Sequence, residues 1–215
     1  ILERNLNIKW FARARVNTVD REILKLMKDA GCVAVAYGIE SGSEKILKSI
    51  KKGINTKQAK EAVKISSEMG FIVTNFFIVN MPGETILDID MTLDMMDEFE
   101  KYPNVSNYYC FAMIYPGTEL EKIAKKQFLH NFSWYEPYYS SKNRSVGNDP
   151  VIPCFEQKEL PIENIKIHIL KRKRWHSKIK KALNKLNRIK NIKELIEFIR
   201  FSLKYFLAKP VNIKQ

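Results

Sequence analysis

The stretch that decides the fold is residues 71–85, FIVTNFFIVNMPGET. Its first nine residues are mainly β-branched and aromatic, which favours a strand over 71–79. The Pro-Gly pair that follows is typical of a tight turn, and Thr85 can cap a helix over 85–101. A strand, a short loop and a helix in this order are the repeating unit of α/β proteins.

The same unit recurs on both sides of this stretch, so that four copies fill residues 6–127. The predicted strands are 6–15, 32–38, 71–79 and 106–114, and the predicted helices are 19–30, 43–50, 56–69, 85–101 and 118–127. Strands that alternate with helices pair in parallel through right-handed crossovers. The sequence therefore predicts the α/β class, with four βα units that form an arc of a barrel or half of a doubly wound sheet.

Two local expectations accompany this assignment. Thr18 is expected to cap the first helix, since a hydroxyl before an amphipathic run satisfies free backbone N–H groups. The continuous apolar run Cys32–Gly38 is typical of a strand that is covered on both faces.

Polar or glycine-containing segments follow all four strands. Because the carboxyl ends of parallel strands meet at one edge, these loops are expected to lie together and form a site. Each piece also has an ordinary interpretation as a turn, a helix cap or, for Arg15, a salt bridge with Asp20. The four segments are 13–17, 38–42, 80–85 and 115–118.

The charge is distributed unevenly along the chain. Residues 161–215 hold 16 Lys and Arg against three acids, which equals the net charge of +13 of the whole chain. Two helices are expected there, over 162–186 and 189–208, after an irregular segment over 130–160. This basic tail is interpreted as a helical hairpin that packs on the α/β body or as a pair of helices that bind an anionic membrane surface. Binding to nucleic acid is a third interpretation with less support.

Three scattered cysteines predict neither a disulfide framework nor a metal site and suit the cytoplasm. A membrane-bound tail would make the protein peripheral there. No secretory signal is recognisable. The chain starts with Ile1 rather than Met, and a strand-like run follows almost at once, which suggests that it is an excerpt of a longer protein.

Five segments, taken in order, resemble the second part of the radical S-adenosylmethionine (SAM) catalytic domain, in the branch that often carries an upstream cobalamin-binding domain. They are WFARARVN (10–17), DREILKLMKDAGC (20–32), YGIESGSEKILKSIKKG (37–53), FFIVNMPGET (76–85) and YPGTEL (115–120). The resemblance covers about half of the chain. It implies the last four βα units of a partial (β/α)6 TIM-like barrel over 1–129, followed by the irregular cover over 130–160 and the basic helical extension over 161–215.

The resemblance also implies a set of cofactor-binding residues. Arg15 would face SAM, Glu40 and Ser41 would lie by its ribose and methionyl part, and Tyr115 would close the site. The adenine side would be lined by Ile78 and by the turn that contains Gly83 and Glu84. Asn80 stands where relatives often have glycine; since asparagine tolerates left-handed geometry, the turn is expected to persist.

The family binds a [4Fe–4S] cluster through a CxxxCxxC loop, which is absent from this sequence. The resemblance therefore implies a fragment of a radical SAM enzyme whose cluster, bound upstream, cleaves SAM to a 5′-deoxyadenosyl radical that acts on an unknown small-molecule or lipid substrate. A cobalamin-dependent methyl transfer is one such reaction. The fragment alone is predicted to be inactive, and the alternative is a non-catalytic α/β scaffold that carries a cationic hairpin.

Overall fold

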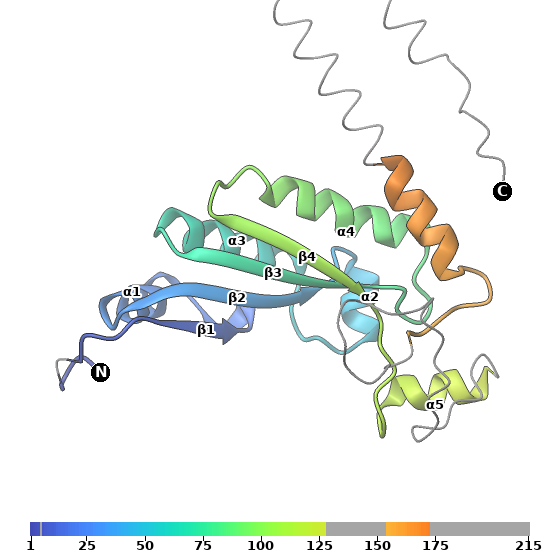
Figure 1. Cartoon of the computed structure of the whole chain (residues 1–215), viewed down its shortest axis with the longest axis horizontal. Helices are drawn as coiled ribbons and strands as arrows, with labels where there is room; N and C mark the ends of the chain where they lie inside the picture. Colours follow the sequence, from blue (N-terminus) through green and yellow to red (C-terminus); the bar gives the residue numbers. More distant parts are fainter. Residues whose placement is uncertain (5, 128–153, 173–215) are drawn as a thin grey trace, which may run out of the picture. The chain divides into compact units, whose positions relative to one another are not determined.

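A computed structural model describes residues 1–4, 6–127 and 154–172 of the chain (Figure 1). The chain divides into two compact units, Ile1–Ile162 and Glu163–Gln215. Residues 162–172 are helical, which agrees with the start of the first predicted tail helix. The rest of the basic tail and most of the predicted segment 130–160 lie outside the described residues, so the domain boundaries remain predictions.

The first unit is a four-stranded parallel sheet with the strand order β1-β2-β3-β4. In chain order the elements are β1 (Trp10–Ala14), η1 (Val16–Thr18), α1 (Arg21–Asp29), β2 (Cys32–Glu40), α2 (Glu44–Ser49), α3 (Thr56–Glu68), β3 (Ile72–Val79), α4 (Ile86–Phe99), β4 (Val105–Phe111) and α5 (Glu119–Lys126). The predicted α/β class and the four βα units are therefore confirmed.

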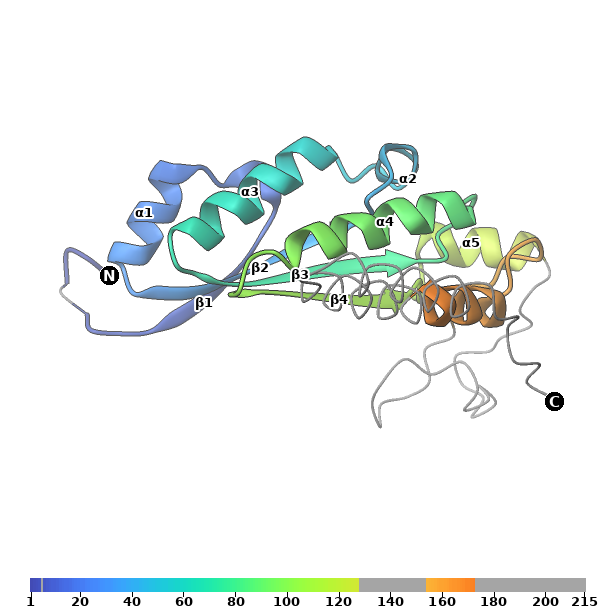
Figure 2. The same cartoon turned by 90° about the horizontal axis from the view of Figure 1, so that it is seen from above.

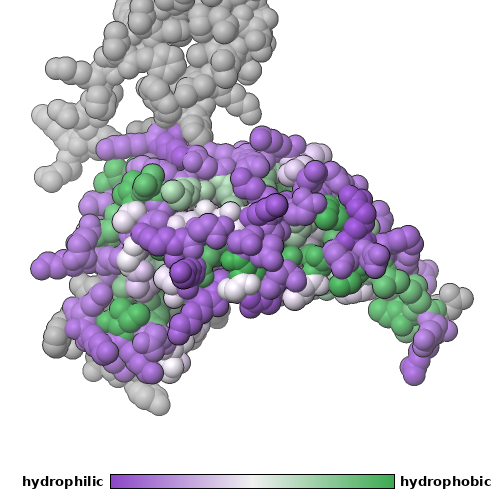
Figure 3. All heavy atoms as spheres, turned by 180° about the vertical axis from the view of Figure 1, so that it is seen from behind, coloured by the Kyte–Doolittle hydropathy of each residue, from purple (hydrophilic) through white to green (hydrophobic). Residues whose placement is uncertain are grey.

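The helices α1, α3 and α4 all lie on one face of the sheet (Figures 1 and 2). Alternate strand side chains point into the layer between sheet and helices, where the main hydrophobic core lies. Fully buried aromatic rings form its centre, among them Tyr37, Phe71 and Phe77. From the helix side, the surface is mainly hydrophilic with small hydrophobic areas (Figure 3).

The opposite side of the sheet is called the open face here. It carries Phe11 and Arg13 from β1, Ala36 and Gly38 from β2, and Phe76 and Tyr108 from β3 and β4. No helix of the described part of the first unit covers it (Figure 2). The expectation that β2 is covered on both faces is thus wrong for the described residues: the small side chains of Ala34, Ala36 and Gly38 make the strand look apolar throughout, although only the other face carries its core residues.

Two element ends also differ from the sequence expectations. The first strand begins at Trp10 rather than Leu6, and Thr18 closes a 3₁₀ turn instead of capping α1. The cap of α1 is Asp20, whose carboxylate accepts a hydrogen bond from the Ile23 backbone N–H at 2.8 Å. A carboxylate at this position also complements the positive end of the helix.

Residues 154–157 return to the carboxyl edge of the sheet. Cys154 forms an antiparallel bridge with Met113, and the Phe155 N–H donates to the Ala112 carbonyl at 2.6 Å. Both Cys154 and Phe155 are buried. Within the described residues, no helix has the length and apolar character that a membrane crossing requires.

Candidate functional site

Glu40 ends β2 in a left-handed conformation, with φ of 74°. This conformation is uncommon for a residue other than glycine, and it coincides with a shift in the register between β2 and β3. The turned backbone places one carboxylate oxygen 2.6 Å from the Lys52 Nζ, and both side chains are less than one-fifth exposed. The pair is therefore held away from bulk water, at the carboxyl end of the sheet.

Gly38 makes room for this pair. A Cβ atom at position 38 would stand 2.7 Å from the Glu40 Oε1 and 3.3 Å from the Lys52 Nζ. A side chain at this position would therefore shift the Glu40 carboxylate from its present place over Gly38.

Arg15 extends from the end of β1 toward the loop after α2. Its guanidinium donates to the Lys52 carbonyl and, at 3.4 Å, to the Asn17 Oδ1, while the Asn17 side-chain amide donates to the Gly53 carbonyl. The alternative in which Arg15 pairs with Asp20 is wrong, because Asp20 caps α1. Lys52 thus connects Arg15 and Glu40: its backbone carbonyl binds Arg15, and its side-chain ammonium binds Glu40.

The turn after β3 adopts the geometry that the sequence suggested. Asn80 has φ of 68° and Gly83 has φ of 75°, both in the left-handed region. The Asn80 side chain is buried, and its amide donates to the Phe155 carbonyl at 3.0 Å. Asparagine therefore replaces glycine at this position without loss of the turn, because its own amide binds the returning segment.

Gln157 binds the same turn from the other side. Its amide oxygen accepts from the Gly83 N–H at 2.8 Å, and its amide nitrogen donates to the Asn80 Oδ1 at 3.0 Å and to the Glu84 carbonyl at 3.2 Å. Three hydrogen bonds from one buried side chain hold the turn in a single arrangement.

Glu84 lies inside this turn and is only 3% exposed. One of its carboxylate oxygens accepts from the Met81 N–H at 3.0 Å, and the other has no hydrogen-bond partner among the described residues. Burial of the carboxyl raises its pKa from 4.5 to about 7, since the charged form loses its hydration. Glu84 is therefore a structural residue of the turn in this structure, and its carboxyl does not reach an open surface.

Ser41 and Ser43 connect the loop after β2 to α4. The Ser41 hydroxyl is 3.1 Å from the Thr92 hydroxyl, and the Ser43 hydroxyl donates to the Asp88 carboxylate at 2.7 Å. Lys45 binds the same carboxylate at 2.5 Å. Burial alone would raise the pKa of Asp88, but the hydrogen bonds from Lys45, Ser43 and Thr85 hold it well below its usual range.

The remaining two predicted residues lie nearby with looser contacts. Ile78 is half-buried on β3 and packs against the small cluster around Phe155. Tyr115 is 44% exposed, and its hydroxyl contacts the Met113 sulfur at 3.9 Å.

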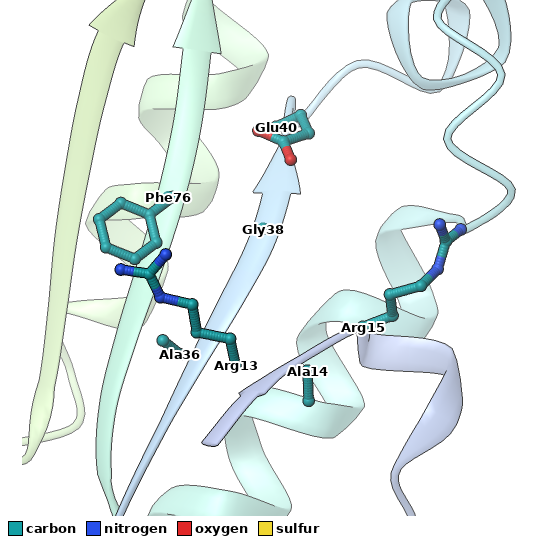
Figure 4. Close-up of a pocket in the computed structure, with 7 residues that line it drawn as sticks. All are labelled: Arg13, Ala14, Arg15, Ala36, Gly38, Glu40 and Phe76. Atoms are coloured by element: carbon teal, nitrogen blue, oxygen red, sulfur yellow. The ribbon is translucent and has the colours of Figure 1, made fainter. Parts of the chain in front are cut away.

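A hollow of about 510 Å³ opens beside Glu40 (Figure 4). It is lined by Arg13, Ala14, Arg15, Ala36, Gly38, Glu40 and Phe76. Of the predicted residues, only Arg15 and Glu40 line this hollow. Ser41 and Glu84 are buried in the loops behind it, and Ile78, Gly83 and Tyr115 are not part of its lining.

Sequence reasoning did not select four residues that matter here: Arg13, Lys52, Phe76 and Gln157. The alternation of β1 was a usable signal for Arg13, which stands on the same face as Phe11. Gln157 gave no local signal, because its partners are more than 70 residues away in the chain.

The parallel sheet, with a hollow at the carboxyl ends of its strands, is the arrangement by which α/β proteins bind cofactors. Residues 2–96 match the family model of the radical SAM superfamily. This stretch of the chain resembles the superfamily, as the order of its motifs indicated.

Curated relatives show the same resemblance. The chain is 37% identical over 136 residues to an uncharacterized methyltransferase of Pyrococcus horikoshii, which covers 62% of this chain and 29% of the relative. It is 44% identical over 86 residues to a putative methylthiotransferase of Methanocaldococcus jannaschii, which covers 40% of this chain and 19% of the relative. The chain thus spans less than a third of the length of either relative.

Solved structures show the same fold. The apo form of the cobalamin-dependent SAM radical enzyme OxsB matches with a TM-score of 0.52 at 16% identity, covering 95% of this chain and 34% of that one. The SAM methyltransferase TsrM of Kitasatospora setae, with cobalamin and a [4Fe–4S] cluster bound, matches with a TM-score of 0.50 at 17% identity, covering 68% of this chain and 28% of that one. At these identities the likeness concerns the fold alone.

Proposed function

We propose that the protein is a radical SAM methyltransferase of the cobalamin-associated branch and that this chain contributes part of its SAM-binding barrel. The observation that carries the proposal is the hollow beside Glu40, which lies toward the carboxyl ends of the parallel strands. The stretch that forms it matches the model of a superfamily that uses SAM. Methyl transfer is supported by the relative from Pyrococcus horikoshii, which is named a methyltransferase, whereas the relative from Methanocaldococcus jannaschii is named a methylthiotransferase.

The residues at the hollow fit a SAM ligand. The Glu40 carboxylate can accept hydrogen bonds from an ammonium group or ribose hydroxyls, and Lys52 holds it in place. The Arg15 guanidinium, whose present partner is a backbone carbonyl, can bind a carboxylate.

The protein's own residues would orient and shield the cofactor rather than move protons. The described residues include no group of three or more His, Cys, Asp or Glu side chains that could hold a metal ion. The [4Fe–4S] cluster would be held by residues outside the described part of the chain, and together with SAM it would supply the one-electron chemistry. Cobalamin is proposed from the branch alone.

The proposed substrate is a small molecule, as in the relative named cytidylyl-2-hydroxyethylphosphonate methyltransferase from Streptomyces wedmorensis, 34% identical over 87 residues that cover 37% of this chain and 16% of the relative. The comparisons give no support to a membrane or nucleic-acid partner. The basic tail that suggested such partners lies largely outside the described residues, and the interpretation of its role stays a prediction.

The test uses the full-length protein after anaerobic reconstitution with iron and sulfide. We expect reductive cleavage of SAM, and we expect Glu40→Gln and Arg15→Gln each to raise the Kd for SAM about tenfold or more, which corresponds to the loss of a charge-assisted hydrogen bond. Lys57→Gln, which removes an exposed charge on α3, serves as the control. Failure of the reconstituted wild-type protein to bind SAM would overturn the proposal.

A further inference from the structure

Arg13 is a cation of the hollow that the proposed SAM site does not use. It projects from β1 onto the open face, and its guanidinium lies beside the Phe76 ring, whereas Arg15 points toward the loop after α2 (Figure 4). Arg13 is exposed, and its guanidinium makes no hydrogen bond or ion pair with any other described residue. A guanidinium in this state is available for a ligand.

The charge around Arg13 favours an anion. Among the residues that the structure describes, Glu40 is the only acid that lines the hollow, and its carboxylate is already paired with Lys52 at 2.6 Å. Arg13 and Arg15 are therefore not balanced by a lining acid, and the hollow is net positive. Arginine binds carboxylate and phosphate groups through two parallel hydrogen bonds.

The surface next to Arg13 suits a flat apolar body. Phe76 and Tyr108 are stacked on the open face with ring centroids 6.1 Å apart and an interplanar angle of 29°. They are 42% and 58% exposed, so ring surface is available to a ligand. Next to them, the small residue Ala36 of β2 lines the hollow, while the Glu40 carboxylate and the Lys52 ammonium lie over Gly38.

Arg13 and Glu40 stand at different depths of the sheet. Arg13 pairs with Ala36, which is opposite Thr74, whereas Glu40 is opposite Phe77. Three to four residues thus separate the two levels, roughly 10–13 Å at ~3.3 Å per residue. The Arg13 side chain extends along the sheet to the Phe76 ring, whereas the Glu40 carboxylate is directed to Lys52, so the two groups face different parts of the hollow (Figure 4).

We propose that Arg13 anchors the anionic group of the substrate, a carboxylate or a phosphate, while an aromatic or other flat apolar part lies on the Phe76 and Tyr108 rings. This rests on the proposed function, because it makes the SAM-proximal end of the hollow the reacting end. The substrate then extends along the open face from Arg13 toward the SAM-proximal end of the hollow.

The experiment measures binding of three matched probes to the full-length protein by equilibrium dialysis: 2-naphthoate, 2-naphthyl phosphate and the neutral 2-naphthamide. We expect at least one of the anionic probes to bind about tenfold more tightly than the amide, and the better of the two identifies the anion. Arg13→Gln should reduce this preference to near one, and Phe76→Leu should weaken all three probes. The control Lys57→Gln should leave the preference unchanged.

SAM binding separates this inference from the proposed function. Arg13→Gln should keep the wild-type Kd for SAM; a tenfold loss would place Arg13 in the SAM site and overturn the inference. An unchanged anion preference in Arg13→Gln would overturn it as well. If the wild-type protein shows an Arg13-dependent anion preference but binds no SAM, the anion site stands and the proposed function fails.

Discussion

Replacement of Gly42 by alanine tests the way in which the loop after β2 is seated on α4. A Cβ atom at position 42 would stand 2.4 Å from the Met91 carbonyl oxygen and 2.7 Å from both the Met91 carbonyl carbon and the Thr92 Cα. All three are backbone atoms of α4, so none can rotate away. The loop or the helix must therefore move.

The magnitude follows from two contributions. Overpacking of this kind typically costs 1–3 kcal/mol. Displacement of the loop would also break the hydrogen bond that the Gly42 N–H donates to the Thr92 hydroxyl at 2.9 Å, which is worth about 1 kcal/mol. We expect Gly42→Ala to lower the free energy of unfolding by about 2–4 kcal/mol.

Gly83→Ala is the matched control, because it carries a different and smaller cost. A Cβ atom at position 83 would meet no atom within 4 Å, but φ of 75° disfavours any residue with a side chain. The expected loss is about 1–2 kcal/mol. Urea unfolding of the full-length protein, followed by circular dichroism, measures both variants. If Gly42→Ala costs less than 0.5 kcal/mol (about a third of the Gly83→Ala loss), the loop is not seated against α4 as described.

Three further predictions concern the charged and amide groups around the hollow. The pKa of Glu84 is raised from 4.5 to about 7 in the folded state, so between these pH values the folded protein keeps a proton that the unfolded chain releases. The free energy of unfolding should therefore fall as the pH rises from 4.5 to 7, by up to ~1.4 kcal/mol per pH unit. Urea titrations of Glu84→Gln should lack this slope. Lys52→Met leaves the Glu40 carboxylate without its partner and should cost about 1–3 kcal/mol in the same assay, whereas an equal loss in Lys52→Arg would argue against the pair. Gln157→Ala removes the acceptor of the Gly83 N–H, so hydrogen exchange of that amide should accelerate at least tenfold, and unchanged protection would contradict the role of Gln157 in the turn.

The sequence predicted those features whose cause is local. The βα order, the caps Ser43, Thr85 and Thr118, and the left-handed Asn80 all depend on residues within a few positions of each other. The predicted cap of α1, Thr18, was wrong. Thr18 and Asp20 are both acceptable caps, and the choice between them depends on the 3₁₀ turn that separates β1 from α1.

The site was predicted less completely, because its connections are long-range. Lys52 pairs with Glu40 only after β2 ends in a left-handed residue, and Gln157 reaches the turn from a segment that shows no periodicity. The sequence could place Arg15 and Glu84 at strand ends. It could not show that the Arg15 side chain binds a neighbouring loop or that the Glu84 side chain is buried.

Asp88 and Gln157 each form hydrogen bonds with several segments, and this has a consequence for comparisons between relatives. The Asp88 carboxylate accepts hydrogen bonds from Ser43 and Lys45 and also from Thr85, which follows the turn after β3. Gln157 binds that turn from a third segment. The free-energy effects of substitutions in these segments should therefore be non-additive, since each group changes the environment of the next. Single-residue exchanges with another enzyme would misreport the contribution of each position, whereas transfer of all three segments as one block would preserve their mutual fit.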